Sequence, residues 1–255
     1  MPFMLHSVPC LDDNYAYLLH DEKTGATAVV DVPEAAPIEA ALAQKGWRLS
    51  DILITHHHHD HIGGVEALRA ATGARVWGAA DDAHRLPPLD HALAEGDSVR
   101  IGAEAGRVLE VPGHTVGHIA FHFPDSKLAF TADSLMALGC GRLFEGRAEQ
   151  MWDSLCKLMA LPDDTLICSG HDYSKGNAAF ALSVDADNPD LRARIKGFDT
   201  ARAAGEPMAQ ASLALEKATN PFLRAGDAQM KAALDMADQG DGAVFAHLRA
   251  LKDAF

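Results

Sequence analysis

The chain has 255 residues, of which 48% are hydrophobic and 23% are charged, values that fit one large or two modest globular domains. Its formal net charge of −14 argues against non-specific binding to nucleic acids or membranes, because their phosphates would be repelled. An anionic substrate would therefore need a locally basic pocket.

The four cysteines lie far apart and form no CxxC pair, which indicates reduced thiols rather than a disulfide framework or a cysteine zinc site. The N-terminal residues lack the basic and apolar regions of a signal peptide, and no apolar run approaches the roughly 18 residues of a membrane-spanning helix. We therefore expect a cytoplasmic protein that binds neither nucleic acid nor membrane.

The first two thirds of the chain alternate short strands with helices. The patterns predict strands over 27–32, 51–55, 74–79 and 165–170, a strand within 107–115, and a hairpin within 118–133 that turns at Pro-Asp-Ser-Lys. They predict helices over 34–46, 63–73 and 149–162, the first two ending at a glycine.

From residue 174 onward the pattern is Ala-rich and helical, with almost no strand signal. We therefore predict an α+β protein with two domains, 1–173 and 174–255, the second of them helical.

The stretch Thr55–Gly64, "THHHHDHIGG", follows a predicted strand and predicts a metal site. In an extended chain side chains alternate, so His56 and His58 project to one side while His57 and His59 project to the other. Asp60 and His61 follow where the chain turns towards two glycines, and approach the same cavity from a second direction. The pattern H-x-H-x-D-H thus offers two ligands to each of two ions, with His57 and His59 as non-ligands.

Four ligands do not complete two sites, and further candidates stand at the ends of later strands. These are His114, Asp133 and His171, and the carboxylate of Asp133 could bridge two cations. His118 is interpreted as a supporting histidine rather than a ligand. The remaining histidines are interpreted as ordinary polar residues: His6, His20, His84, His91, His122 and His247.

These residues resemble the metallo-β-lactamase superfamily, and within it the glyoxalase II (hydroxyacylglutathione hydrolase) family. The matching stretches span the whole chain: "LDDNYAYLL", "LITHHHHDHIGG", "PGHTVGH", "FTADSLMALGCGRLFEG", "CSGHDYSKGN", "NPFLR" and "LRALKDAF". The resemblance implies a four-layer αββα sandwich, with residues 1–173 as the catalytic domain and 174–255 as a helical substrate-binding domain. We expect a monomer.

The resemblance further implies two divalent metal ions per chain, zinc, with iron or manganese as alternatives, since histidine and carboxylate ligands suit all three. It places one ion on His56, His58 and His114, the other on Asp60, His61 and His171, and Asp133 between them. For glutathione it implies five binding residues: Arg142, Phe144, Tyr173, Arg249 and Lys252. Many relatives have Lys and Tyr where this chain has Arg142 and Phe144, so the charge is kept and a hydroxyl is lost.

The activity implied is hydrolysis of the thioester S-D-lactoylglutathione to D-lactate and glutathione, the second step of methylglyoxal detoxification. A hydroxide activated by the two metals would attack the carbonyl, with Asp60 and Asp133 as the catalytic carboxylates. The alternative is a mononuclear iron persulfide dioxygenase on the same fold, which also uses glutathione but holds one iron on two histidines and one aspartate. Metal stoichiometry distinguishes the two.

Overall fold

The structure is a computed structural model that describes residues 2–255. The chain forms two compact units. The first contains the described residues up to Glu110 together with Gly117–Ala132, and the second contains Val111–Val116 and Asp133–Phe255. This division follows contacts between residues and differs from the boundary at residue 173, which stays a prediction about function.

The first unit contains a mixed six-stranded sheet with the strand order β1-β2-β3-β4-β5-β6. Its first three strands are antiparallel, and β3 to β6 run parallel to one another. The strands are β1 Met4–Cys10, β2 Asn14–His20, β3 Thr27–Val30, β4 Asp51–Leu53, β5 Arg75–Ala79 and β6 His91–Leu93. The sequence patterns predicted β3, β4 and β5 but assigned no strand to residues 4–20.

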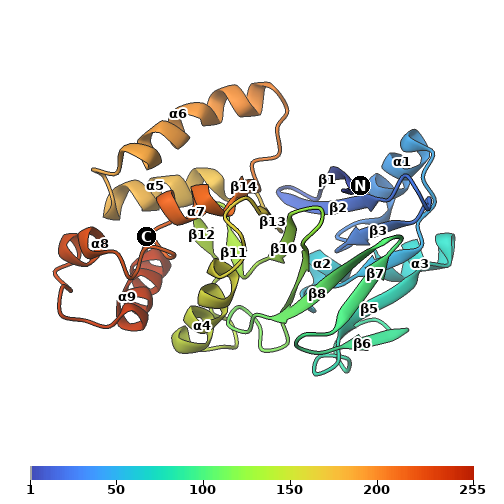
Figure 1. Ribbon diagram of the computed structural model, residues 1–255, viewed down its shortest axis with the longest axis horizontal. Coiled ribbons are helices and arrows are strands. Elements are labelled where there is room, and N and C mark those ends of the chain that lie inside the picture. Colours follow the sequence, from blue (N-terminus) through green and yellow to red (C-terminus); the bar gives the residue numbers. More distant parts are fainter. Residues whose placement is uncertain (1) are drawn as a thin grey trace. The chain divides into compact units, whose positions relative to one another are not determined.

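Two helices, α1 Ala35–Lys45 and α3 Val65–Thr72, cover one face of this sheet (Figure 1). Both end at a glycine with a left-handed conformation, Gly46 at φ 68° and Gly73 at φ 72°, as the predicted glycine stops require. Ile38 of α1 and Leu68 of α3 are fully buried in one hydrophobic cluster with the sheet residue Ile52. Burying side chains of this size stabilises the layer by about 1.5–3 kcal/mol each.

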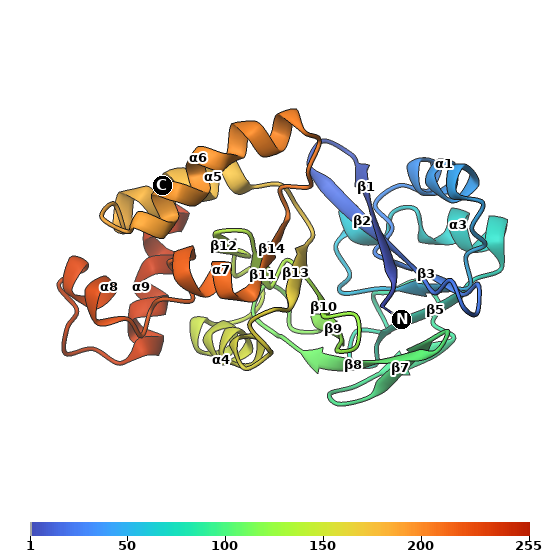
Figure 2. The same ribbon diagram turned by 45° about the horizontal axis from the view of Figure 1, so that its top comes forward.

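Four antiparallel strands lie on the opposite face of this sheet, as Figure 2 shows for β7 and β8. They are β7 Ser98–Ile101, β8 Glu104–Glu110, β9 Ile119–Phe123 and β10 Leu128–Ala132. Aromatic rings fill the space between the layers: Phe3 meets Phe123 edge-on at 5.3 Å, and Tyr17 meets Phe130 at 5.6 Å. The hairpin predicted within 118–133 is therefore β9 and β10.

The second unit is mostly helical. Its helices are α4 Ala148–Met159, α5 Ser174–Val184, α6 Pro189–Ala203, α7 Leu213–Thr219, α8 Ala228–Ala233 and α9 Asp241–Ala254. It also contains the antiparallel pairs β11 Leu135–Met136 with β12 Gly139–Cys140, and β13 Leu166–Ser169 with β14 Gln210–Ser212. The strand β14 lies inside the region expected to be helical, where three residues are too few to show an alternating pattern.

Aromatic and charged residues hold the helices of this unit together. Phe222 stacks on Phe180 at 5.8 Å and meets Phe245 edge-on at 5.9 Å. The carboxylate of Glu216 is fully buried, pairs with Arg194 at 2.5 Å, and accepts a bond from the backbone N–H of Leu138 at 3.0 Å. This network fastens the turn between β11 and β12 to α6 and α7.

Among residues 2–255, no helix is both long and apolar enough to span a membrane. All four cysteines are free thiols, and only Cys156 is exposed. Burial raises the pKa of the Cys140 thiol to about 11 and that of Cys168 to about 12, so both stay protonated at neutral pH.

Candidate metal centre

The histidine run leaves β4 in an extended conformation anchored by Asp31. The carboxylate of Asp31 accepts bonds from the backbone N–H of Thr55 at 2.9 Å and from its hydroxyl at 2.8 Å. Asp31 has a left-handed φ of 57°, which aspartate tolerates better than most residues. The chain is still extended at His58 (φ −61°, ψ 142°), and a short helix, α2 His59–Ile62, begins at the next residue. Extended chain followed by a helical turn is the geometry that the H-x-H-x-D-H spacing predicted.

His56 and His58 present their ring nitrogens to each other. Nε2 of His56 lies 3.2 Å from Nδ1 of His58. The ring of His56 is fully buried and stacks on His118 at 4.6 Å with an interplanar angle of 13°. The hydroxyl of Thr55 lies 3.0 Å from its Nδ1. His56 is therefore held on its face and on the nitrogen that points away from His58.

Asp60 and His61 come from α2. Nδ1 of buried His61 lies 2.8 Å from Asp31, and because a carboxylate oxygen only accepts, this nitrogen carries the proton. In a neutral ring the lone pair is then on Nε2, which lies 3.8 Å from the carboxylate of Asp60. The side-chain amide of buried Asn14 donates to both the backbone carbonyl and the carboxylate of Asp60, at 3.0 and 3.3 Å.

In the second unit, His114 and His171 both approach the carboxylate of Asp133. Nε2 of His114 is 3.4 Å and Nε2 of His171 is 3.3 Å from the same Asp133 oxygen. Nδ1 of His114 donates to the carbonyl of Arg142 at 2.8 Å, which leaves its Nε2 lone pair facing Asp133. Gly141 packs so closely here that a Cβ would lie 2.1 Å from the carbonyl oxygen of Asp133.

The donor atoms fit divalent cations. Two ligands at about 2.1 Å from a tetrahedral ion stand about 3.4 Å apart. Three of the four distances above, 3.2, 3.3 and 3.4 Å, are close to this value, and the distance from His61 to Asp60 is longer at 3.8 Å. In the neutral rings of His61 and His114, Nδ1 donates its proton to an oxygen, so the lone pair of Nε2 faces a carboxylate. Two acceptors that face each other repel, and a cation between them stabilises the arrangement.

Potential ligand atoms gather in three groups, and within each group they all lie within 4.8 Å of one another. The groups are His56, His58 and His114; Asp60, His61 and His171; and Asp31, His56 and His61. In the third group both oxygens of Asp31 already accept hydrogen bonds from Thr55 and His61. The other two groups are consistent with a binuclear metal site.

Three of the predicted glutathione residues are accessible on the second unit. The side chain of Arg142 is 60% exposed and its Nε lies 3.5 Å from Asp253. The ring of Phe144 is exposed and meets His114 edge-on at 5.3 Å. Tyr173 is exposed and stacks on His171 at 4.6 Å with an interplanar angle of 8°. These aromatic rings therefore lie directly against two predicted metal ligands.

Arg249 and Lys252 of α9 are more enclosed than a solvated helix face would be. Arg249 is 5% exposed, donates to the carbonyl of Cys140 at 2.9 Å and pairs with Asp253 at 2.9 Å. Its guanidinium also lies over the ring of Phe222 at 5.1 Å. The ammonium of Lys252 donates to the carbonyl of Gly176 at 3.1 Å, and burial, with a smaller effect of Arg249, lowers its pKa.

Asp31 and Asn14 support this site, although neither was predicted from the sequence as one of its members. Asp31 directly follows β3, so an aspartate at a strand end was the available signal. Asn14 lies in "LDDNYAYLL", one of the stretches that resemble the family. Both contact predicted ligands, which are 30 and 46 residues away in the chain.

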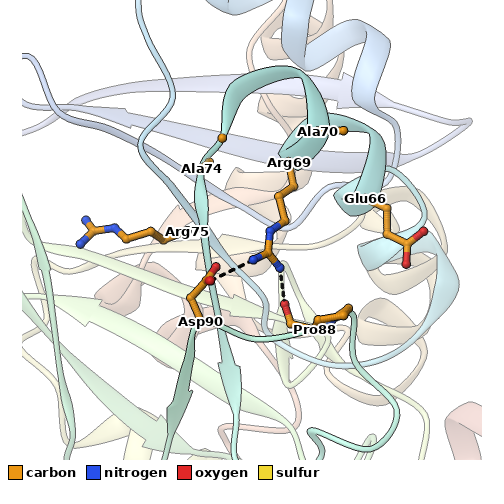
Figure 3. Close-up of a pocket in the computed structure, with 8 residues that line it drawn as sticks. Glu66, Arg69, Ala70, Ala74, Arg75, Pro88 and Asp90 are labelled. Carbon is orange, nitrogen blue, oxygen red and sulfur yellow. Dashed lines mark hydrogen bonds and ion pairs between the residues drawn. The ribbon is translucent and has the colours of Figure 1, made fainter.

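One surface pocket lies away from these residues, beside α3 and β5 (Figure 3). Its central Arg69 donates to the carbonyl of Pro88 at 2.6 Å and pairs with Asp90 at 2.9 Å. The guanidinium therefore serves to fasten α3 to the segment before β6, and the pocket contains none of the predicted site residues.

The comparisons with known proteins agree with this fold and donor set. Residues 12–171 match the model of the metallo-β-lactamase superfamily, and residues 172–255 match that of the hydroxyacylglutathione hydrolase C-terminus. The solved structure of ETHE1 from Myxococcus xanthus superposes with a TM-score of 0.70 at 28% identity, covering 98% of this chain and 90% of that one. The fold is thus a metallo-β-lactamase fold with two mixed sheets and a C-terminal helical domain, and the chain belongs to the metallo-β-lactamase superfamily.

Two relatives narrow the class. A hydroxyacylglutathione hydrolase of Cereibacter sphaeroides is 65% identical over 255 residues, which is the full length of both chains. One of a Jannaschia species is 63% identical over 249 residues, covering 98% of this chain and 97% of the relative. The chain belongs to the hydroxyacylglutathione hydrolase (glyoxalase II) family of thioester hydrolases. The predicted family and fold class are therefore confirmed.

Proposed function

We propose that the protein hydrolyses S-(2-hydroxyacyl)glutathione, with S-D-lactoylglutathione as the substrate, to D-lactate and glutathione. The reaction would be the second step of methylglyoxal detoxification in the cytoplasm, carried out by a monomer. The observation that carries the proposal is the pair of His and Asp groups in a chain whose C-terminal 84 residues match the model of the hydroxyacylglutathione hydrolase C-terminus. That match favours the hydrolase over the persulfide dioxygenase.

We assign one divalent ion to His56, His58 and His114. Asp60, His61 and His171 would hold the other ion, and Asp133, whose carboxylate lies beside both His114 and His171, would bridge the two. Zinc is the proposed metal, with iron and manganese as alternatives, because imidazole and carboxylate donors accept all three. When bound, such ions lower the pKa of a water molecule from 15.7 towards neutrality and polarise a carbonyl oxygen.

The protein's own groups would orient the reactants. The carboxylate of Asp60 is 40% exposed on its side chain and held by Asn14, so it is placed to accept a hydrogen bond from the attacking water. The carboxylate of Asp133, beside His114 and His171, would add a second negative charge to the site. The leaving group is a thiolate, whose conjugate acid has a pKa near 8.5, so departure needs no strong general acid.

Glutathione carries carboxylates that a protein of net charge −14 would repel unless cations met them locally. We propose that Arg142 meets a carboxylate directly, because its guanidinium is exposed, while Phe144 and Tyr173 pack against the tripeptide. Arg249 and Lys252 add positive charge, and Arg249 shares Asp253 with Arg142. In this proposal residues 1–173 form the catalytic domain and 174–255 the substrate-binding domain, close to the junction of the two family models at 171/172.

The test is hydrolysis of S-D-lactoylglutathione by the metal-loaded protein. The loss of thioester absorbance measures the reaction, once before and once after the metal is removed with a chelator. The proposal expects about two metal ions per chain and activity that chelation abolishes and added zinc restores. The same acyl group on a thiol without the glutathione carboxylates is the control and should show a raised KM. One iron per chain with oxygen consumption on glutathione persulfide would instead establish the dioxygenase, and no turnover of the thioester would refute the hydrolase.

A further inference from the structure

His57 stands between two proposed metal ligands but turns towards a buried carboxylate. Its Nδ1 lies 3.1 Å from an oxygen of Asp82, which comes from the turn after β5. Because a carboxylate only accepts, Nδ1 carries the proton. Nε2 of His57 is then an acceptor, and Nη1 of Arg85 lies 3.3 Å from it. Both ring nitrogens are thus engaged within the first unit.

Asp82 is the centre of this arrangement. Its side chain is 1% exposed, and its second oxygen pairs with Arg85 at 2.7 Å from Nε and 2.5 Å from Nη2. Gly117, in the loop "PGHTVGH", presses on the same carboxylate, because a Cβ there would lie 2.4 Å from Cγ of Asp82. The next residue, His118, stacks on His56. Asp82 therefore connects the histidine run on one side to the loop that supports His56 on the other.

A buried carboxylate is costly unless its oxygens are hydrogen-bonded, so this cluster forms one arrangement only when His57 and Arg85 are both in place. His57 is bonded through the backbone to His56 and His58, whose nitrogens already stand 3.2 Å apart. Fixing the middle residue of three in an extended chain fixes the directions of both neighbours, since side chains alternate.

We propose that Asp82 is a positioning residue: through His57, and supported by Arg85, it holds His56 and His58 in ligating geometry before a metal ion binds. The proposal rests on the proposed function in that these two histidines share one ion. Mutation of a residue that is hydrogen-bonded to a metal ligand typically lowers metal affinity by about 10- to 100-fold. Here Asp82 is bonded to His57, which stands between the two proposed ligands.

The test uses the full chain loaded with two zinc ions and follows zinc release to a chromophoric chelator. Asp82→Asn keeps the size of the side chain and should speed the release of one of the two ions by about 10-fold or more, with the other ion unaffected. The matched control is Asp81→Asn, the same change at the exposed neighbouring position, which should release zinc as the wild type does. His57→Leu should repeat the effect of Asp82→Asn, and His57→Gln, which keeps a donor for Asp82, should restore slow release.

The melting temperature of the metal-free variants separates positioning from a general loss of structure. If Asp82→Asn releases both ions faster in proportion to a lower melting temperature, or releases neither ion faster, Asp82 does not position the ligands. If His57→Leu releases zinc as the wild type does, the connection through His57 is refuted. A wild-type chain that holds fewer than two zinc ions contradicts the proposed function itself, which is a different result from unchanged release in the variants.

Discussion

Replacing Asp31 with asparagine changes one atom of a buried side chain and is expected to remove one metal ion. Asp31 accepts three hydrogen bonds, two from Thr55 and one from Nδ1 of His61, at 2.8 to 2.9 Å. An asparagine keeps one acceptor oxygen for the backbone N–H of Thr55. Its amide nitrogen then faces two groups that were donors.

Those two groups have an alternative hydrogen-bonding arrangement. The hydroxyl of Thr55 accepts as well as donates, and His61 can move its proton from Nδ1 to Nε2 and accept at Nδ1. Each charge-assisted bond, worth about 1.5–3 kcal/mol, then becomes a neutral one of about 1 kcal/mol. The free energy of unfolding of the metal-free protein should fall by about 2 kcal/mol, a moderate loss. The functional loss is larger, because a proton on Nε2 of His61 blocks the atom that would bind the metal.

We therefore expect Asp31→Asn to fold, to keep one ion, and to bind the other about 10- to 100-fold more weakly. Urea unfolding of the metal-free protein measures the first quantity, and zinc titration against a competing chelator measures the second. The control is Asp12→Asn, the same change at an exposed position near the start of β2. An Asp31→Asn variant that binds both ions like the wild type would refute the tautomer argument, even if its stability were lower.

Four further outcomes are expected from particular contacts and from the burial of the thiols. Asn14→Ala removes the donor that holds the carboxylate of Asp60, and should lower kcat by about 10-fold with little change in KM, measured by steady-state thioester hydrolysis. Arg142→Ala and Arg249→Ala should both raise KM by about 10-fold more than they lower kcat, and an unchanged KM would remove the residue from glutathione binding. Only Arg249→Ala should also lower the melting temperature, because Arg249 alone is buried and bonded to Cys140. One thiol per chain, Cys156, should react with a disulfide reagent in the native protein and four after unfolding. Because burial raises the pKa of the buried thiols, the native state keeps protons that the unfolded state releases, so the free energy of unfolding should fall as the pH rises above about 9, as urea unfolding at several pH values would measure.

The directions of the side chains in the histidine run could be predicted from the sequence. Side-chain alternation depends only on local backbone geometry, so the facing of His56 and His58 could be predicted from an extended chain after a strand. The helical turn that contains Asp60 and His61 was likewise indicated by the two glycines that follow. Helix ends at Gly46 and Gly73 were predictable for the same reason, since a left-handed residue is a local requirement.

Contacts between distant segments of the chain could not be predicted from the sequence. The bonds from Asp31 to His61 and from Asp82 to His57 join residues 30 and 25 positions apart. Asp31 stands at the end of a predicted strand, but no local pattern shows which distant side chain either aspartate would meet. Arg249 is the reverse case. A charged residue in a terminal helix is usually solvated, whereas here the carbonyl of Cys140 and the ring of Phe222 enclose it.

The two buried aspartates explain how an acidic chain maintains a dense cluster of imidazoles. In the first unit Asp31 holds the start and the end of the histidine run, at Thr55 and His61, and Asp82 holds its middle, at His57. Each carboxylate loses hydration on folding, a cost that is offset only when all its donors are present. Each donor bond also selects the protonated nitrogen of a ring. The side chains around the run therefore determine both the direction and the tautomer of the histidines, so that removing either aspartate should weaken metal binding more than it weakens folding.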